Sequence, residues 1–179
     1  MKIKEIDILD KSSTTMNFLI KKLLELHNRG HIFGSEWSLI SIIATLSNRK
    51  TVIYGIYEND IEMPMGIVMF TNITVYGDSL FSIIFFDIDN KDKILIDGEY
   101  IPLFAPVKED MISKFQTHSI STYVVGENPF YSKILESLGF EKIGVKKEAM
   151  FDEGKHKDIS LYYYLMKDSD NPELNRKFH

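Results

Sequence analysis

The stretch Asn128-Pro-Phe-Tyr-Ser-Lys-Ile-Leu-Glu-Ser-Leu-Gly-Phe140 decides the fold, because it contains the start, the body and the end of one helix. An asparagine can accept a backbone N–H as the N-cap, and the proline after it lacks only an N–H that would have had no partner. Gly139 suits the left-handed conformation that commonly ends a helix. Three apolar residues at helical spacing form its inner face: Ile134, Leu135 and Leu138. The sequence predicts a helix over residues 129–138.

The segments on either side of this helix have the composition of strands. His118–Val125 is rich in β-branched and apolar residues, which favours a buried strand. After the helix, residues 142–150 and 159–166 flank Asp152-Glu-Gly-Lys155, whose composition is typical of a hairpin turn. We therefore expect a strand, a helix and a closing hairpin in direct succession, with a positive φ at Gly154.

These segments resemble a known superfamily. Asn128 to Phe140 is similar to the Asn-x-x-x-x-x-x-x-Glu-x-Leu-Gly-Phe signature of the Gcn-related N-acetyltransferases (GNAT), where it forms the helix after the fifth strand. Gly144-Val-Lys-Lys-Glu148, followed by Gly154, Asp158 and Tyr162, is similar to the ending of the branch that includes the ribosomal-protein N-acetyltransferases. The resemblance implies an α/β fold in which helices flank a mixed, mostly antiparallel sheet with a C-terminal β-hairpin. It also implies acetyl-CoA as co-substrate and an amine, for example a protein N-terminus, as acceptor.

Composition limits the other possibilities. At 179 residues and 44% hydrophobic content, the chain suits one core, so we expect a single domain over residues 1–167 and a flexible tail over 168–179. A formal charge of −5 argues against a nucleic-acid surface. The absence of cysteine excludes disulfides, thiolate metal sites and a cysteine nucleophile, and the histidines do not suggest a metal site. No apolar run approaches the roughly twenty residues that span a bilayer. We expect a cytoplasmic protein without a membrane partner.

The first half of the chain predicts a strand, two helices and a three-stranded meander. The strand covers residues 3–9, and the first helix begins among Ser12–Thr15 and ends at Gly30. We expect Ser35 to cap the second helix, whose inner side would carry Trp37, Ile40, Ile43, Ala44 and Leu46.

The meander strands cover residues 51–57, 65–73 and 80–87. Leu80–Phe86 is nearly continuous in apolar character, so we expect it to be central and covered on both faces. Gly55 and Gly66 predict a bulge or a close approach of the backbone. By resemblance, the central strand and the strand over 118–125 should splay apart to admit a pantetheine arm.

Residues 87–98 depart from the superfamily pattern. GNAT enzymes have (Arg/Gln)-x-x-Gly-x-(Gly/Ala) here, and its backbone N–H groups wrap the pyrophosphate of coenzyme A. This chain has four aspartates and one glycine, Gly98, in the same span. Lys91 and Lys93 could neutralise phosphate or could simply be solvated. We also expect Pro102 and Pro106 to interrupt the following segment, which leaves a clean helix only over 106–115.

The resemblance implies further site residues, each with a structural alternative. Asn128 would turn towards the coenzyme, or act only as the N-cap. Leu135 occupies the place where many members have a tyrosine that protonates the departing thiolate. Tyr131, one turn earlier, could donate that proton or could be a packed aromatic residue. Glu148 and Asp158 are the acids that could serve as general base, or they could simply face solvent. His118 is a further titratable group, with a structural role as its alternative.

Two functions remain open at this stage. One is an acyl-CoA-dependent N-acetyltransferase in which the amine attacks the thioester directly. The alternative is a catalytically degenerate GNAT-fold protein that acts as a binding or structural subunit, including a viral one.

Overall fold

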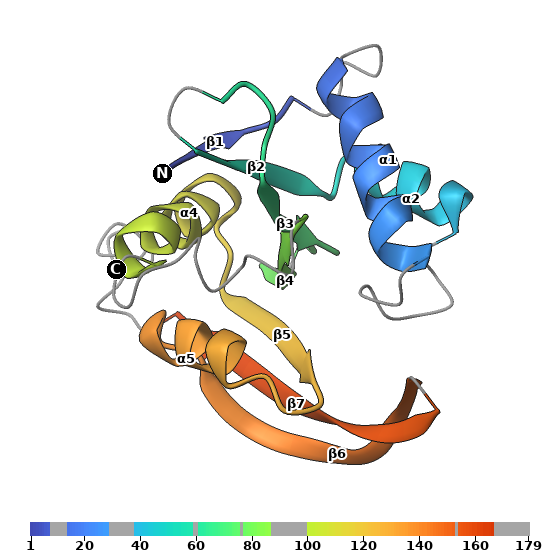
Figure 1. Ribbon diagram of the computed structural model, residues 1–179. Helices are drawn as coiled ribbons and strands as arrows, with labels where there is room; N and C mark the ends of the chain where they lie inside the picture. The colour runs from blue at the N-terminus through green and yellow to red at the C-terminus, as the bar shows by residue number, and fades with distance from the viewer. Residues whose placement is uncertain are drawn as a thin grey trace, which may run out of the picture.

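The computed structural model describes residues 1–7, 14–28, 38–58, 61–75, 77–86, 100–152 and 154–166. Within these ranges, four helices flank a seven-stranded sheet (Figure 1). The elements in chain order are β1 (Lys2–Glu5), α1 (Thr14–Asn28), α2 (Leu39–Leu46), β2 (Val52–Tyr57), β3 (Gly66–Thr71), β4 (Asp78–Phe85), α4 (Tyr100–Phe115), β5 (Ser119–Val125), α5 (Pro129–Ser137), β6 (Glu141–Asp152) and β7 (Lys155–Leu165). The proposed tail over 168–179 lies outside the described residues, and the single-domain boundary stays a prediction.

The sheet has the strand order β1-β2-β3-β4-β5-β7-β6 and is antiparallel except between β4 and β5. The predicted meander is confirmed as β2-β3-β4, and the predicted hairpin as β6 and β7. The parallel pairing of β4 with β5 covers only three residue pairs and ends at Leu80–Ser121. The expected splay of these two strands is thereby confirmed, and we call the region beyond this last pair the fork.

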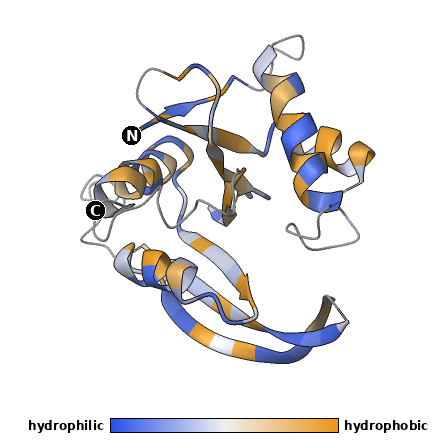
Figure 2. Cartoon of the chain, viewed as in Figure 1, coloured by the Kyte–Doolittle hydropathy of each residue, from blue (hydrophilic) through white to orange (hydrophobic). Residues whose placement is uncertain are grey.

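Helices pack on both faces of the sheet and form two separate cores. Apolar residues of α1 and α2 pack on one face against β2 and β3, with Leu19, Leu23 and Ile42 fully buried. Residues of α4 and α5 pack on the other face, where Phe70 and Phe104 are among the largest buried side chains. Apolar and polar residues accordingly alternate around each helix in Figure 2.

Two expectations about helices are wrong. The second helix, α2, begins at Leu39 with Ser38 as its N-cap, because the Ser38 hydroxyl accepts the Ser41 N–H at 3.2 Å. Its buried residues are Ile42 and Leu46, one turn apart, whereas Ile40 is 81% exposed and Ile43 and Ala44 are also exposed. A helix of two turns buries only the stripe that contacts its neighbours. Trp37 and Ser35 lie outside the described residues.

The second wrong expectation concerns the prolines, because α4 is continuous from Tyr100 to Phe115. Pro102 is in the first turn, where a missing N–H costs nothing. Pro106 is inside the helix, but Phe104, Val107 and Met111 bury their side chains around it. Such packing can outweigh a proline penalty of about 3 kcal/mol.

The expectations about four glycines are confirmed, whereas β1 (Lys2–Glu5) is shorter than the strand predicted over 3–9, and β4 alternates between buried and half-buried residues, so it is not fully covered on both faces. Gly139 and Gly154 have φ of +85° and +77°, as a helix end and a hairpin turn require. A Cβ at Gly55 would lie 2.6 Å from the Tyr57 ring, and one at Gly66 would lie 2.7 Å from the Ile84 carbonyl oxygen. Both are therefore sites of close approach.

Candidate functional site

The fork between β4 and β5 contains a backbone N–H that does not pair with the neighbouring strand. The Ile83 N–H donates instead to the hydroxyl of Tyr131, at 2.9 Å. Tyr131 reaches this point from the first turn of α5, which packs over the same face of the sheet. A side chain thus occupies the place that a strand partner would take in a continuous ladder.

Tyr131 remains protonated at neutral pH. The residue as a whole is half-buried but its hydroxyl is buried, and burial raises the pKa of the phenol to about 12. Hydrogen bonds from the Ile83 N–H and from Thr122 work in the opposite direction and are the weaker influence. The fork therefore contains a neutral hydrogen-bond donor next to a backbone N–H.

Asn128 orients this tyrosine. Its side-chain oxygen accepts the Tyr131 backbone N–H at 3.1 Å, which makes it the N-cap of α5 as expected. Loss of such a cap typically costs about 1 kcal/mol. A contact between Asn128 and coenzyme A stays a prediction.

Glu148 and Asp158 lie together at a bulge of the hairpin. The register of β6 against β7 shifts between Lys146 and Met150, and Glu148 within this bulge has a φ of +48°. Asp158 accepts the Glu148 N–H at 2.9 Å and the Lys147 ammonium at 2.6 Å. The Lys147 hydrogen bond, followed by that of the Glu148 N–H, lowers the pKa of Asp158. The Asp158 carboxylate thus holds the bulge together.

This bulge is offset from the fork. The Asp158 carbonyl accepts the Gly126 N–H at 2.8 Å, so Asp158 lies beside the end of β5, and Glu148 lies one strand further out. Within the described part of the chain, no hydrogen bond joins either carboxylate to Tyr131. The structure groups Asn128 with Tyr131, and Glu148 with Asp158, without joining the two pairs.

Three predicted site residues, Lys91, Lys93 and Gly98, lie outside the described residues together with the rest of the loop over 87–98. Their role at a pyrophosphate stays a prediction. Among the described residues there is no group of three His, Cys, Asp or Glu side chains that could hold a metal ion. In the same part of the chain, no helix is both long enough and apolar enough to span a membrane.

The sequence did not reveal two members of the fork. Thr122 is 4% exposed and belongs to the buried alternation of β5, where a polar residue between Ile120 and Val124 was the available signal. No sequence pattern could identify the Ile83 N–H, because a backbone donor becomes available only where two strands diverge in the folded structure.

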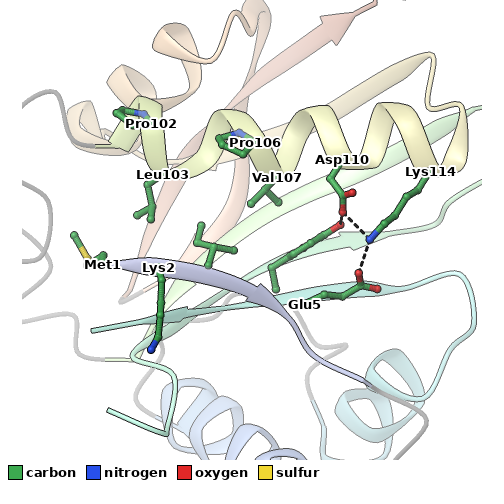
Figure 3. Close-up of a pocket in the computed structure, with 11 residues that line it drawn as sticks. Met1, Lys2, Glu5, Pro102, Leu103, Pro106, Val107, Asp110 and Lys114 are labelled. Atoms are coloured by element: carbon green, nitrogen blue, oxygen red, sulfur yellow. Dashed lines mark hydrogen bonds and ion pairs between the residues drawn. The ribbon is translucent and has the colours of Figure 1, made fainter. Parts of the chain in front are cut away.

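A second polar cluster lies elsewhere, at a cavity of about 520 Å³ between β1 and α4 (Figure 3). Asp110 accepts the Tyr54 hydroxyl at 2.5 Å and the Lys114 ammonium at 2.9 Å, and Lys114 also contacts Glu5 at 2.6 Å. Burial first, and then the hydrogen bond to Asp110, raises the pKa of Tyr54. The described site residues Asn128, Tyr131, Glu148 and Asp158 do not line this cavity. The cluster ties α4 to β1 and β2 and is separate from the fork.

A mixed sheet that splits at a short parallel strand pair, with helices on both faces, defines the GNAT fold. Comparison with solved structures confirms this fold. A point mutant of the spermidine N-acetyltransferase SpeG from Vibrio cholerae matches with a TM-score of 0.69 and 18% identity, over 99% of both chains. The spermidine N-acetyltransferase from the same organism in complex with CoA and spermine matches with a TM-score of 0.66 and 16% identity, over 92% of this chain and 94% of that one.

Sequence comparison gives no corresponding match, since no protein-family model and no curated protein matches this chain. At 16–18% identity, the solved structures establish the shared fold. The finer assignment to the ribosomal-protein branch stays a prediction.

Proposed function

We propose that the protein is an acyl-CoA-dependent N-acetyltransferase that transfers an acetyl group to an amine. The fork carries this proposal, because β4 and β5 separate after Leu80 and Ser121 and place the Ile83 N–H and a neutral phenol between them. An extended pantetheine arm would pair with the β4 backbone in this gap by taking over the Ile83 N–H from the Tyr131 hydroxyl. Support also comes from the fold, which is shared with an acetyltransferase solved in complex with CoA and spermine.

The reaction proceeds by direct attack. The amine nitrogen donates its lone pair to the thioester carbonyl carbon, and a new C–N bond forms. Backbone N–H groups of β4 stabilise the negative charge that develops on the carbonyl oxygen. The C–S bond then breaks, the sulfur leaves with the bonding electrons, and the nitrogen loses a proton. Holding both substrates in one gap supplies most of the acceleration through orientation, without a covalent enzyme intermediate.

Tyr131 is the proton donor to the departing sulfur in this proposal. Its hydroxyl lies in the fork and is protonated at neutral pH. Asn128 positions it by capping α5 and would contact the coenzyme. Lys91, Lys93 and the backbone at Gly98 would hold the pyrophosphate, in place of the glycine-rich loop that GNAT enzymes have.

Glu148 and Asp158 are the proposed acids for removing the proton from the amine, directly or through water. A lowered pKa makes Asp158 the weaker base, and its two hydrogen bonds favour a role in the bulge. Glu148 is exposed next to it.

A thiol-release assay tests the proposal. The chain contains no cysteine, so a thiol reagent detects released coenzyme A without background from the protein. Purified protein should release coenzyme A from acetyl-CoA only when an amine is present. The assay is run with a polyamine, an arylalkylamine and a peptide N-terminus as acceptors. If the protein increases the release of coenzyme A with none of the three, the proposal is contradicted and the degenerate scaffold is favoured.

A further inference from the structure

Within the described ranges, helices cover one face of the sheet over only half of its width. The described residues of the core under α1 and α2 include residues of β2 and β3, with Ile84 and Phe86 packed against it, and none from β5, β6 or β7. On β5, Ile120 and Val124 point into the opposite core, so Ser121 and Tyr123 point to the uncovered face. On β7, Tyr162 belongs to that opposite core in the same way.

This uncovered face is apolar and partly aromatic. Tyr123 pairs with Leu161, and Ser121 pairs with Tyr163. Tyr123 is 42% exposed, Leu161 38% and Leu165 49%, and Tyr163 is half-buried. We call Ser121, Tyr123, Leu161, Tyr163 and Leu165 the open face. Large side chains exposed side by side indicate a binding surface more often than isolated ones do.

The open face is continuous with the fork. Ser121 is the last residue of β5 that pairs with β4, and Tyr123 follows two positions later on the same side of the sheet. A molecule lying on Tyr123 and Leu161 therefore borders the gap that contains the Ile83 N–H. An acceptor whose amine enters the fork would place its remaining atoms on this face.

The charges on this face do not suit a polycation. From residues 119 to 125 of β5 and 159 to 165 of β7, the outward positions are Ser, Tyr, Val, Ile and Leu. Among the described residues, both cations and carboxylates border this face. Lys157 continues the alternation of β7, and on the outermost strand Lys146 pairs with Ile159 and Glu141 with Tyr163. At the other end, the Asp78 carboxylate accepts the hydroxyl of Ser119. These carboxylates are offset by the two lysines, so the face has no net negative charge to compensate the several ammonium groups of a polycation that would leave water.

We propose that the acceptor is a monoamine with an apolar or aromatic body, which lies on the open face while its amine enters the fork. This inference rests on the proposed function and specifies its substrate class. It predicts a preference opposite to that of polyamine acetyltransferases. A peptide whose first residues are apolar shares part of this chemistry and is one arm of the test.

The test compares kcat/KM for phenethylamine, an apolar peptide and spermidine in the thiol-release assay. Phenethylamine should exceed spermidine by at least about tenfold, which corresponds to the partial burial of one aromatic ring. Leu161→Glu should lower kcat/KM for phenethylamine about tenfold, because it places a charge under the apolar body. The Kd for coenzyme A should not change.

Val145→Glu is the matched control. Val145 is 42% exposed on the same hairpin, but it pairs with Ser160, which also pairs with the inward-pointing Val124, so it lies on the other side of the sheet. This variant should keep the wild-type preference. An equal loss in both variants, a preference for spermidine or the peptide, or binding of coenzyme A without turnover of phenethylamine would overturn the inference. Calorimetry on the same samples distinguishes failure of this inference from failure of the proposed function. If coenzyme A does not bind, the proposed function itself is rejected.

Discussion

In the proposed mechanism Tyr131 acts as an acid, although burial raises the pKa of its phenol to about 12. An ordinary thiol has a pKa of about 8.5, so proton transfer from this phenol to a solvated thiolate would be uphill. A thiolate formed in the fork would lose its hydration as well, which raises its pKa towards that of the phenol. The shared burial of donor and leaving group makes the transfer feasible.

Tyr131→Phe should therefore reduce kcat by about 10²–10⁴-fold, the range expected for loss of a general acid. The Kd for coenzyme A should change little, because the ring still fills its place. Tyr54→Phe is the control, since it also removes a hydrogen-bonded phenol but at the cavity between β1 and α4. A Tyr131→Phe enzyme with wild-type kcat would remove this residue from the mechanism.

The contribution of Asp158 to the stability of the folded protein should depend on pH in the acid range. Its folded-state pKa is lowered from the usual 3.8, so its contribution is present above that value and is lost as pH falls through the folded-state pKa. Asp158→Asn should lower the thermal midpoint at pH 7, and the difference from wild type should shrink as the pH falls below 3.8. Thermal unfolding at a series of pH values measures this; a difference that does not depend on pH would contradict it.

The sequence predicted those elements whose own residues mark where they begin and end. α5 has its cap, its proline and its final glycine within thirteen residues, and all three act as expected. α2 and α4 were predicted less well, because their outcome depends on contacts with distant strands. The packing of Phe104 and Met111, which no local pattern encodes, keeps α4 continuous through Pro106.

Because α5 is buried, truncating a side chain at its C-terminal end should strongly lower the free energy of unfolding. Leu138 is 3% exposed at the C-cap, so Leu138→Ala should lower the free energy of unfolding by about 2–5 kcal/mol. Leu165→Ala, at an exposed position of β7, makes the same chemical change and should cost much less. Denaturant unfolding of both variants measures the difference; equal effects would mean that α5 does not anchor the core.

On the scale of the whole molecule, the fork is a property of topology. It requires β4 and β5 to be parallel neighbours for three residue pairs and then to separate, with α5 returning over the gap. The sequence predicted the strands and the helix, and the GNAT resemblance predicted the splay. The Ile83–Tyr131 contact spans 48 residues and could be found only in three dimensions. The division into an open and a covered face also depends on where α1 and α2 pack.

Calorimetric titration of the purified protein with acetyl-CoA tests the central claim most directly, because an N-acetyltransferase must bind its acyl donor whatever its acceptor. The account predicts saturable binding at one site per chain with a Kd on the order of micromolar, equivalent to about −8 kcal/mol. A flat titration at millimolar acetyl-CoA would contradict it and leave the GNAT fold as a scaffold.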